Sequence, residues 1–164
     1  HWAENWSSGM YGTWANDPRA TDIDGPAFEI PMQGLGAFAV RRAAWPGFNP
    51  AFSGFGGEEG YIHMKFRARG DRVLCLPSLR WLHRFARPMG VPYPVTWDDR
   101  FRNYLLGRAE LGLPADDVIA HMRSHVGDGF ADRVLTTLKE RGEFELAATA
   151  PSPSTPPPAS APAE

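Results

Sequence analysis

The stretch FSGFGGEEGYIHMKFRARG, residues 52–70, places two glycines and two adjacent glutamates at the start of a predicted helix. A helix is expected over about 58–68, because Ile62 and Phe66 lie four residues apart on one face and Gly70 is a typical residue to follow a helix end. Acidic residues suit the positive end of a helix dipole, so a loop followed by a solvated helical turn is the simplest interpretation. It does not explain the glycines, which add a cost in backbone entropy.

The segments on either side of this helix predict an α/β unit. A short extended segment is expected at 28–33 and a second strand at 37–40, followed by a loop over 46–57 that is rich in glycine and proline. After the helix, the apolar run RVLCLP at 72–77 predicts a short buried strand. Residues 1–27 show no sustained periodicity and are expected to be irregular structure or the tail of an element that begins upstream.

The C-terminal part of the chain predicts three helices and a tail. Thr96 followed by Asp99 is a start resembling a capping box, and it opens the first of these helices. Apolar residues at helical spacing predict two more, over about 115–126 and 129–141. Residues 146–164 are rich in Pro, Ala and Ser and are expected to be disordered, because they cannot bury a core.

Composition describes a globular protein with no strong overall charge. The chain has 164 residues, of which 43% are hydrophobic, enough for one domain with a core. A net charge of −2 creates no basic field that would recruit nucleic acid. Fifteen of the seventeen basic residues are arginine, which suits carboxylates and phosphates, although an arginine-rich proteome produces the same bias. The single cysteine, Cys75, lies in an apolar run and is expected to be buried and inert.

Three local patterns could carry chemistry. GLGAFA at 34–39 formally matches a dinucleotide-binding pattern but lacks the helix that the pattern requires. Glu59 and His63 are four residues apart and could face one metal ion, although an exposed helix-stabilising pair is the better interpretation. His83, in a segment that also contains Arg84 and Arg87, could bind a divalent metal beside a phosphate group, or be a half-buried histidine in a basic loop.

The order of these pieces resembles a known family. Residues 32–85 are similar to the C-terminal half of GT-A glycosyltransferases of family 2, in the segment shared by polypeptide N-acetylgalactosaminyltransferases and β-1,4-galactosyltransferases. The shared features are a small-residue strand, a glycine-rich loop, a Gly-Gly-Glu helix start, a helix ending in glycine, a strand ending in proline and a later histidine. The resemblance implies an α/β fold in which 1–95 form the C-terminal half of a GT-A catalytic domain and 96–145 a helical extension.

The resemblance implies an acceptor site at the start of the helix. Glu59 matches the general base of inverting members, and Glu58 matches a ligand of the acceptor. Phe55, Gly56 and Gly57 match the loop where the sugar approaches the backbone. Paired acids also raise one pKa, which moves a base closer to neutral pH.

The resemblance also implies a donor site and a metal. Gly34 and Gly36 match small residues that line the donor sugar, and Arg84 and Arg87 are expected to stabilise the departing diphosphate. His83 matches a ligand of a divalent Mn or Mg ion, whose remaining ligands lie upstream in the family.

The family's Asp-x-Asp metal motif has one formal match, Asp22 and Asp24, which we interpret as loop residues. We therefore expect the donor-binding half to precede His1 and this chain to be inactive without it. The predicted function is transfer of a sugar, with inversion, from a nucleotide-sugar donor to a glycan, polysaccharide or protein acceptor. We expect a cytoplasmic location, at most at the membrane periphery, with no transmembrane segment and no nucleic-acid partner.

Two other functions stay open at this point. The first is a carbohydrate- or protein-binding module without chemistry, with stacking faces offered by Trp2, Trp6, Trp14 and Trp81. The second is a metal-dependent hydrolase that uses Glu59, His63 and His83.

Overall fold

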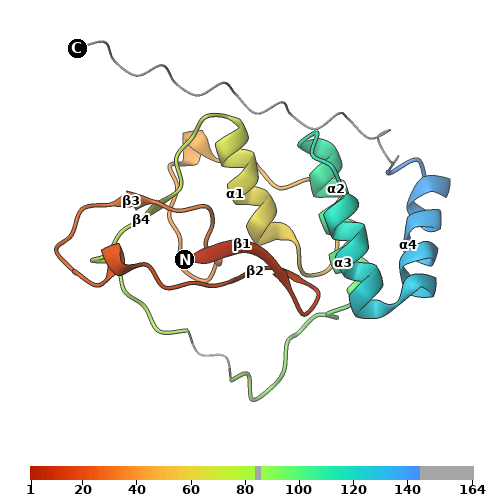
Figure 1. The fold of residues 1–164 in the computed structure, drawn as a ribbon, viewed down its shortest axis with the longest axis horizontal. Coiled ribbons are helices and arrows are strands. Elements are labelled where there is room, and N and C mark those ends of the chain that lie inside the picture. The colour runs from red at the N-terminus through yellow and green to blue at the C-terminus, as the bar shows by residue number, and fades with distance from the viewer. Residues whose placement is uncertain (84–85, 145–164) are drawn as a thin grey trace, which may run out of the picture.

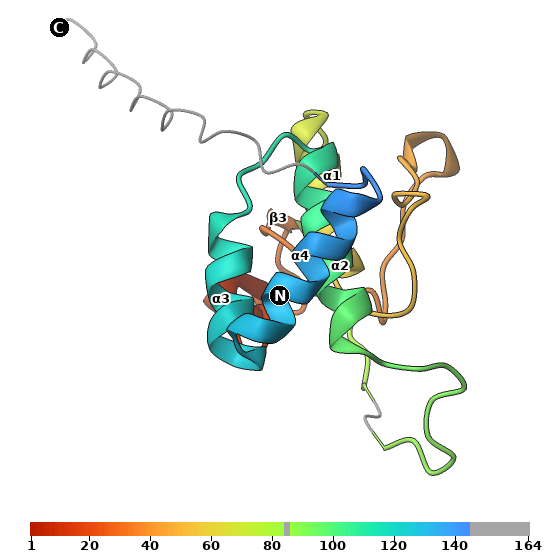
Figure 2. The same cartoon turned by 90° about the vertical axis from the view of Figure 1, so that its right-hand side faces the viewer.

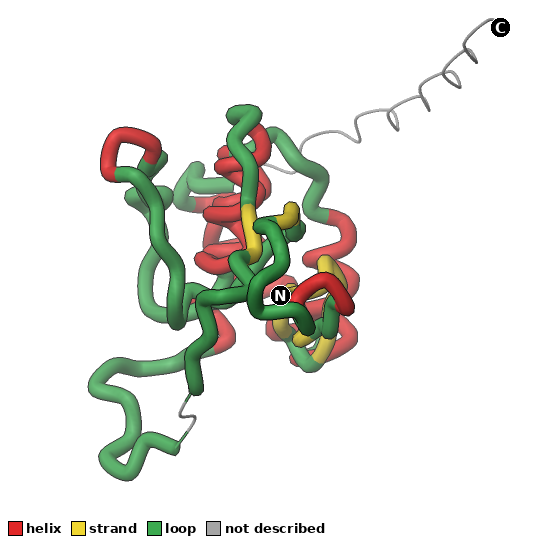
Figure 3. The backbone as a smooth tube through the Cα atoms, turned by 90° about the vertical axis from the view of Figure 1, so that its left-hand side faces the viewer, coloured by secondary structure: helices red, strands yellow, loops and turns green. Residues whose placement is uncertain are grey.

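The structure, a computed structural model, describes residues 1–83 and 86–144. Within these residues the fold is mixed α/β, with four α-helices and two antiparallel sheets of two strands each (Figure 1). The tube in Figure 3 shows that long loops connect the short strands, whereas the helices follow one another closely in the C-terminal part. Arg84 and the predicted tail at 146–164 lie outside the described residues.

The first two strands form a hairpin where irregular structure was expected. β1 (Trp2–Ser7) pairs antiparallel with β2 (Met10–Trp14), and the prediction for residues 1–27 was wrong here. The two-residue loop is Ser8-Gly9, and both residues have positive φ, 49° and 74°. Such turns match the twist of paired strands. A register shift within β1 interrupts the alternation of side chains, which hid the strand from the sequence pattern.

The second sheet is smaller than predicted. β3 (Phe28–Glu29) pairs antiparallel with β4 (Leu74–Cys75), so the predicted strand at 72–77 is short and its Leu74 is 43% exposed. Among the described residues, no strand pairs with the segment 37–40, and the strand predicted there is absent. A short apolar run becomes a strand only where a partner strand is available, which the run itself does not reveal.

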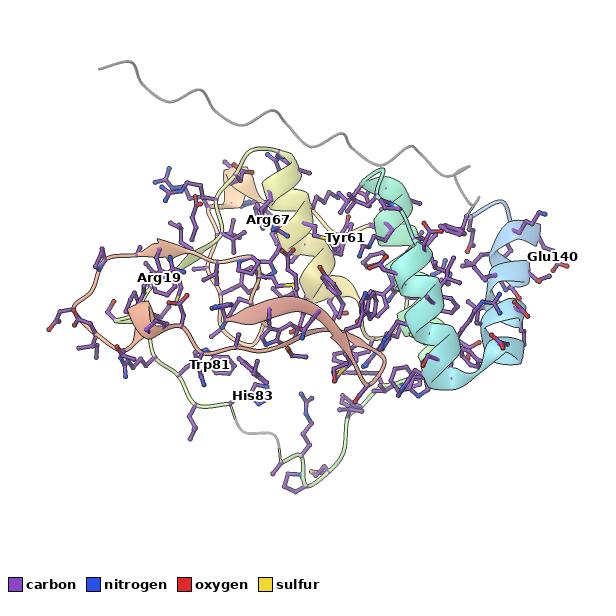
Figure 4. All side chains as sticks on the ribbon, in the orientation of Figure 1. Arg19, Tyr61, Arg67, Trp81, His83 and Glu140 are labelled. Atoms are coloured by element: carbon purple, nitrogen blue, oxygen red, sulfur yellow. The ribbon has the colours of Figure 1, made fainter. Side chains whose placement is uncertain are left out.

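The glycine-rich loop leads into a helix with the predicted bounds. α1 (Glu58–Ala68) begins after Gly57, and its Tyr61 and Ile62 are 2% and 0% exposed. A tyrosine–carboxylate hydrogen bond joins α1 to the next helix: the Tyr61 hydroxyl donates to Glu110 Oε2 at 2.7 Å. Figure 4 shows Tyr61 on the side of α1 that faces this helix.

The three C-terminal helices form the main hydrophobic core, and all three predictions are confirmed. α2 (Trp97–Glu110), α3 (Asp116–Val126) and α4 (Asp128–Glu140) pack together (Figure 2). The Asp99 N–H donates to Thr96 Oγ1 at 3.1 Å, which is the expected cap. None of the described helices combines the length and the hydropathy that crossing a bilayer requires. The core consists of Phe101, Leu105, Ala115, Val118, Met122, Ala131, Val134, Leu138 and Phe144.

The β1–β2 hairpin docks on α3 through a histidine. The Gly9 N–H donates to His121 Nε2 at 3.0 Å, and the Trp6 ring stacks on the imidazole with centroids 4.9 Å apart. The Trp6 Nε1–H also donates to Asp117 Oδ2 at 2.9 Å. The ring of His125 lies parallel to that of His121 at 6.2 Å. The hairpin contact therefore depends on a neutral imidazole, because a protonated ring has no acceptor nitrogen.

Lowering the pH is expected to destabilise this contact. Burial and the neighbouring His125 lower the pKa of His121 below its ordinary value, about 6.5. The stability is therefore fully present above that value and is lost as the pH falls through the folded-state pKa. Urea unfolding at pH 7.5 and 5.5 should show a smaller acid loss in His121→Gln than in the wild type. The His83→Gln control, outside the hairpin contact, should keep the full loss, and equal losses in all three proteins would contradict the assignment. His63, whose pKa is also lowered, adds a background loss common to them.

Candidate functional site

A buried asparagine on α2 holds the glycine-rich loop in place. Asn103 is 2% exposed, and its Nδ2 donates to the carbonyl oxygens of Ser53 and Gly56, each at 2.9 Å. Its Oδ1 accepts a hydrogen bond from the Ser53 N–H at 3.1 Å. Because all three bonds go to the backbone, the side chain sets the path of the loop that leads into α1.

The two glycines before α1 are required by packing against α2. Gly56 and Gly57 have φ values of 107° and 91°, where L side chains are strained. A Cβ at Gly56 would lie 2.5 Å from Arg100 Nε, and a Cβ at Gly57 would lie 3.1 Å from Asn103 Cβ. The structure thus gives the double glycine a packing role. The predicted contact of these glycines with an acceptor sugar stays a prediction.

Glu59, the predicted base, has one oxygen fixed and one open. Its Oε1 accepts a hydrogen bond from the Leu35 N–H at 2.8 Å, while Oε2 accepts none from the described part of the chain. Burial raises the pKa of this half-buried carboxyl, and the charge of Glu58 adds to the rise; the Leu35 N–H and the charge of Arg100 oppose it. A carboxylate with a raised pKa and an open oxygen is suited to accept a proton.

The predicted pairing of Glu59 with His63 is wrong. His63 is 5% exposed, and its Nδ1 donates to the backbone carbonyl of Glu59 at 2.7 Å. Burial lowers the pKa of His63, which favours the neutral form of the ring. It is neither an exposed helix-stabilising partner nor a metal ligand beside the carboxylate.

The described residues do not assemble a metal site. Within 1–83 and 86–144, no three His, Cys, Asp or Glu side chains come together in a way that could hold a metal ion. His83 alone therefore does not fit a complete site, and the upstream ligands stay a prediction. The formal Asp-x-Asp is a turn, as expected: the Asp24 N–H donates to Asp22 Oδ1 at 3.0 Å.

The segment Gly34–Gly36 contacts the Glu59 carboxylate and two tryptophans, Trp2 and Trp81. A Cβ at Gly34 would lie 3.5 Å from Glu59 Oε1 and 3.1 Å from Trp2 Cζ2. A Cβ at Gly36 would lie 2.4 Å from Trp81 Cη2. The structure therefore brings Gly34 next to the predicted base, whereas Gly36 packs against Trp81.

A buried hydrogen-bond donor lies at the same place. The indole nitrogen of Trp2 is buried and has no hydrogen-bond partner among the described residues. The edge of the ring that carries this nitrogen faces Gly34, since Cζ2 and Cε2 would lie 3.1 and 3.4 Å from a Cβ on that glycine. A buried N–H without an acceptor is costly, because the hydrogen bond to water that it loses on folding is not replaced.

The remaining predicted site residues lie in the segment after β4. The rings of Trp81 and His83 are 5.3 Å apart, and Figure 4 shows the two side chains next to each other below the hairpin. Contacts thus lead from Glu59 through Gly34–Gly36 and Trp81 to His83. Arg87 is exposed in the loop that follows.

A cavity of about 200 Å³ opens between α1, β4 and the segment 37–40. Glu59 and His83 are not among its lining residues, so the cavity is not a common cleft for both of them. Cys75 is half-buried against this cavity rather than sealed in a core, which corrects its predicted burial. The residues that line the cavity include Gln33, Ala37, Phe38, His63, Cys75 and Trp81.

Sequence reasoning missed Arg100 and Asn103. Both contact the glycine-rich loop, and Gly107 packs against Tyr61 of α1, where a Cβ would lie 2.9 Å from the ring. Arg100, Asn103 and Gly107 have i, i+3, i+7 spacing, which places them on one helix face. That spacing was the one sign in the sequence that this face of α2 contacts another segment. Polar and glycine residues on a helix face are, however, normally interpreted as solvent-exposed.

Comparison with known protein families found no family model that matches the chain, and comparisons with curated proteins and with solved structures found no match either.

Proposed function

We propose that this chain forms the acceptor-side part of a GT-A glycosyltransferase, in which Glu59 is the general base. The observation that carries the proposal is the Glu59 carboxylate, with Oε1 held by the Leu35 N–H at 2.8 Å and a pKa raised by burial. It lies beside Gly34, which the resemblance assigns to the donor site. The substrates are a nucleotide-sugar donor and a glycan, polysaccharide or protein acceptor.

The proposed chemistry is a single displacement at the anomeric carbon. The acceptor hydroxyl donates its proton to Glu59 Oε2 while its oxygen forms the new bond to the sugar. The bond from the anomeric carbon to the diphosphate breaks, and the diphosphate leaves with the electron pair, which inverts the configuration. Because a hydroxyl is a poor nucleophile, a positioned base contributes about 10²–10⁴-fold to such a step.

The residues around the carboxylate supply positioning. Gly34, which has no side chain, lies beside Oε1, the fixed oxygen of the Glu59 carboxylate, and the Trp2 ring packs against the same glycine. A divalent metal would stabilise the leaving diphosphate in this enzyme class. Since His83 is the one predicted ligand within the described residues, no step is assigned to a metal.

The test is sugar transfer by the natural protein that contains this chain. Incubation with nucleotide sugars and saccharide acceptors should release nucleoside diphosphate only when an acceptor is present. Because Glu59 must be deprotonated to act, kcat/KM should fall at acid pH with an apparent pKa above that of an ordinary glutamate, about 4.3. The proposal is refuted if nucleoside diphosphate is released equally with and without an acceptor. It is also refuted if Glu59→Gln has the same pH profile of kcat/KM as the wild type.

A binding module without chemistry is the second candidate, and one observation favours it. Trp14 and Trp81 are 58% and 39% exposed and present aromatic faces to solvent. Trp6, in contrast, packs between Tyr104 and His121 and is not available. Saccharide binding that is unchanged by Glu59→Gln, with no transfer in the wild type, would favour this candidate.

A further inference from the structure

Arg100, a largely buried residue, carries a guanidinium that has no anionic partner in the described part of the chain. The residue is 9% exposed, and its guanidinium donates no hydrogen bond and forms no ion pair within 1–83 and 86–144. The other four arginines of α2, α3 and α4 each have a carboxylate partner. These pairs are Arg102–Glu143, Arg108–Asp117, Arg123 with Asp128 and Asp132, and Arg133–Asp98.

Aromatic rings and backbone hold this guanidinium in place. Its carbon lies 4.9 Å from the centroid of the Trp97 ring and 5.9 Å from that of Phe55. Gly56 packs directly on the side chain, since a Cβ there would lie 2.5 Å from Nε. Phe55 is in turn stacked on Tyr93, with centroids 5.7 Å apart. The arginine is thus preorganised on apolar surfaces that do not neutralise its charge.

Arg100 lies close to the proposed base without being paired to it. Its charge acts on the Glu59 carboxyl, yet no ion pair joins the two side chains in the described structure. Both residues lie in the first turns of their helices, α1 and α2, and the N-cap Gly57 offers no side-chain oxygen to the N–H groups of α1. The positive ends of two helices therefore add to the charge of the guanidinium.

We propose that Arg100 binds an anionic group, a carboxylate or a phosphate, of the acceptor sugar whose hydroxyl is activated by Glu59. This inference rests on the proposed function and adds the substrate class: the acceptor is an acidic saccharide, such as a uronic acid or a sugar phosphate. The planar fork of arginine matches both anions with two parallel hydrogen bonds. A neutral acceptor would leave the guanidinium without an anionic partner, so the site favours an acidic acceptor over it.

The test is the binding of matched saccharides to the full chain. Binding is monitored by tryptophan fluorescence, because one tryptophan, Trp97, contacts Arg100. The probes are methyl β-glucuronide, glucose 6-phosphate and the neutral methyl β-glucoside. The wild type should bind at least one acidic probe about 10-fold or more tightly than the neutral one. The preferred acidic probe identifies the anion as carboxylate or phosphate.

Two variants assign the preference to this residue. Arg100→Met, similar in volume, should bind the acidic and neutral probes equally, and Arg100→Lys should keep only part of the preference, since it lacks the fork. Arg133→Met is the matched control, because Arg133 also lies over an aromatic ring, that of Phe130 at 4.7 Å, but is paired with Asp98. It should keep the full preference.

Several results would overturn the inference. If the wild type binds acidic and neutral probes equally, the inference is wrong. This result needs no variant, so it holds even if Arg100→Met does not fold. A preference retained in a folded Arg100→Met places the anion elsewhere. Pyrophosphate, the charged part of a nucleotide-sugar donor, is a further probe. If pyrophosphate binds more tightly than both acidic saccharides, and if this binding depends on Arg100, the site belongs to the donor.

The two proposals fail in distinguishable ways. An acidic preference that depends on Arg100, in a protein without sugar transfer, would leave the anion site standing and refute the enzyme. Transfer that depends on Glu59 but proceeds equally well with neutral acceptors would keep the enzyme and refute the acidic substrate class.

Discussion

Glu59→Gln is expected to lower kcat for sugar transfer by about 10²–10⁴-fold, which is the usual contribution of a general base. The glutamine oxygen can still accept the hydrogen bond from the Leu35 N–H, so the side chain stays in place. What is lost is the oxygen that takes the proton of the acceptor hydroxyl. The measurement is initial rates of transfer at saturating substrates, with the wild type and the variant at several pH values.

Glu140→Gln is the matched control, because it makes the same chemical change on the exposed surface of α4, far from α1 (Figure 4). It should leave kcat unchanged. Glu58→Gln should instead raise KM, since Glu58 is the predicted acceptor ligand. The prediction is contradicted if Glu59→Gln keeps kcat within a factor of about 3 of the wild-type value and also keeps the wild-type fall in rate at acid pH. A general base that contributes about 10²-fold or more to the rate is then not at this position.

Asn103→Ala is expected to lower the free energy of unfolding by about 2–4 kcal/mol, because it removes three hydrogen bonds to the backbone of the glycine-rich loop, one of them to the buried Gly56 carbonyl. The affected groups are the Ser53 N–H and carbonyl and the Gly56 carbonyl. Since a domain of this size has about 5–15 kcal/mol in total, the loss is a large part of its stability. Urea unfolding monitored by circular dichroism gives the value.

The control for this variant is Asn5→Ala. Asn5 is exposed on β1, and its Oδ1 accepts a hydrogen bond from Thr13 Oγ1 at 2.6 Å. Its loss should cost less than about 1 kcal/mol. Similar small values for both variants would mean that Asn103 does not hold the loop, and the account of how α2 positions the start of α1 would be wrong.

The local helix signals were sufficient to predict the helices. The bounds of α1 agree with those predicted from Ile62, Phe66 and Gly70, and the Thr96 cap marks the start of α2. These signals act between residues three or four apart, where hydrogen bonds and side-chain contacts form within one segment. The strands fared worse: the β1–β2 hairpin was missed and the predicted strand at 37–40 is absent from the described chain.

Part of the candidate site was also predicted. The sequence singled out Glu59, Gly34 and Gly36, and the structure places Gly34 next to the Glu59 carboxylate and Gly36 against Trp81. It did not single out Arg100 or Asn103, which lie more than forty residues after the loop that they contact. It also assigned His63 to an exposed position, whereas the ring is buried against the chain.

Short-range patterns in the chain were enough to specify where the helices begin and end and which carboxylate stands at the start of α1, because caps, glycines and apolar spacing act over a single turn. Three features emerge only once the chain is packed: the side of α2 that faces the double glycine, the hydrogen bond from Leu35 to Glu59, and the burial of Arg100 without a counter-ion in the described structure. Hydrogen bonding and desolvation of these groups depend on neighbours distant in the chain. Those neighbours are set by the packing of whole helices and loops, which a local pattern does not encode.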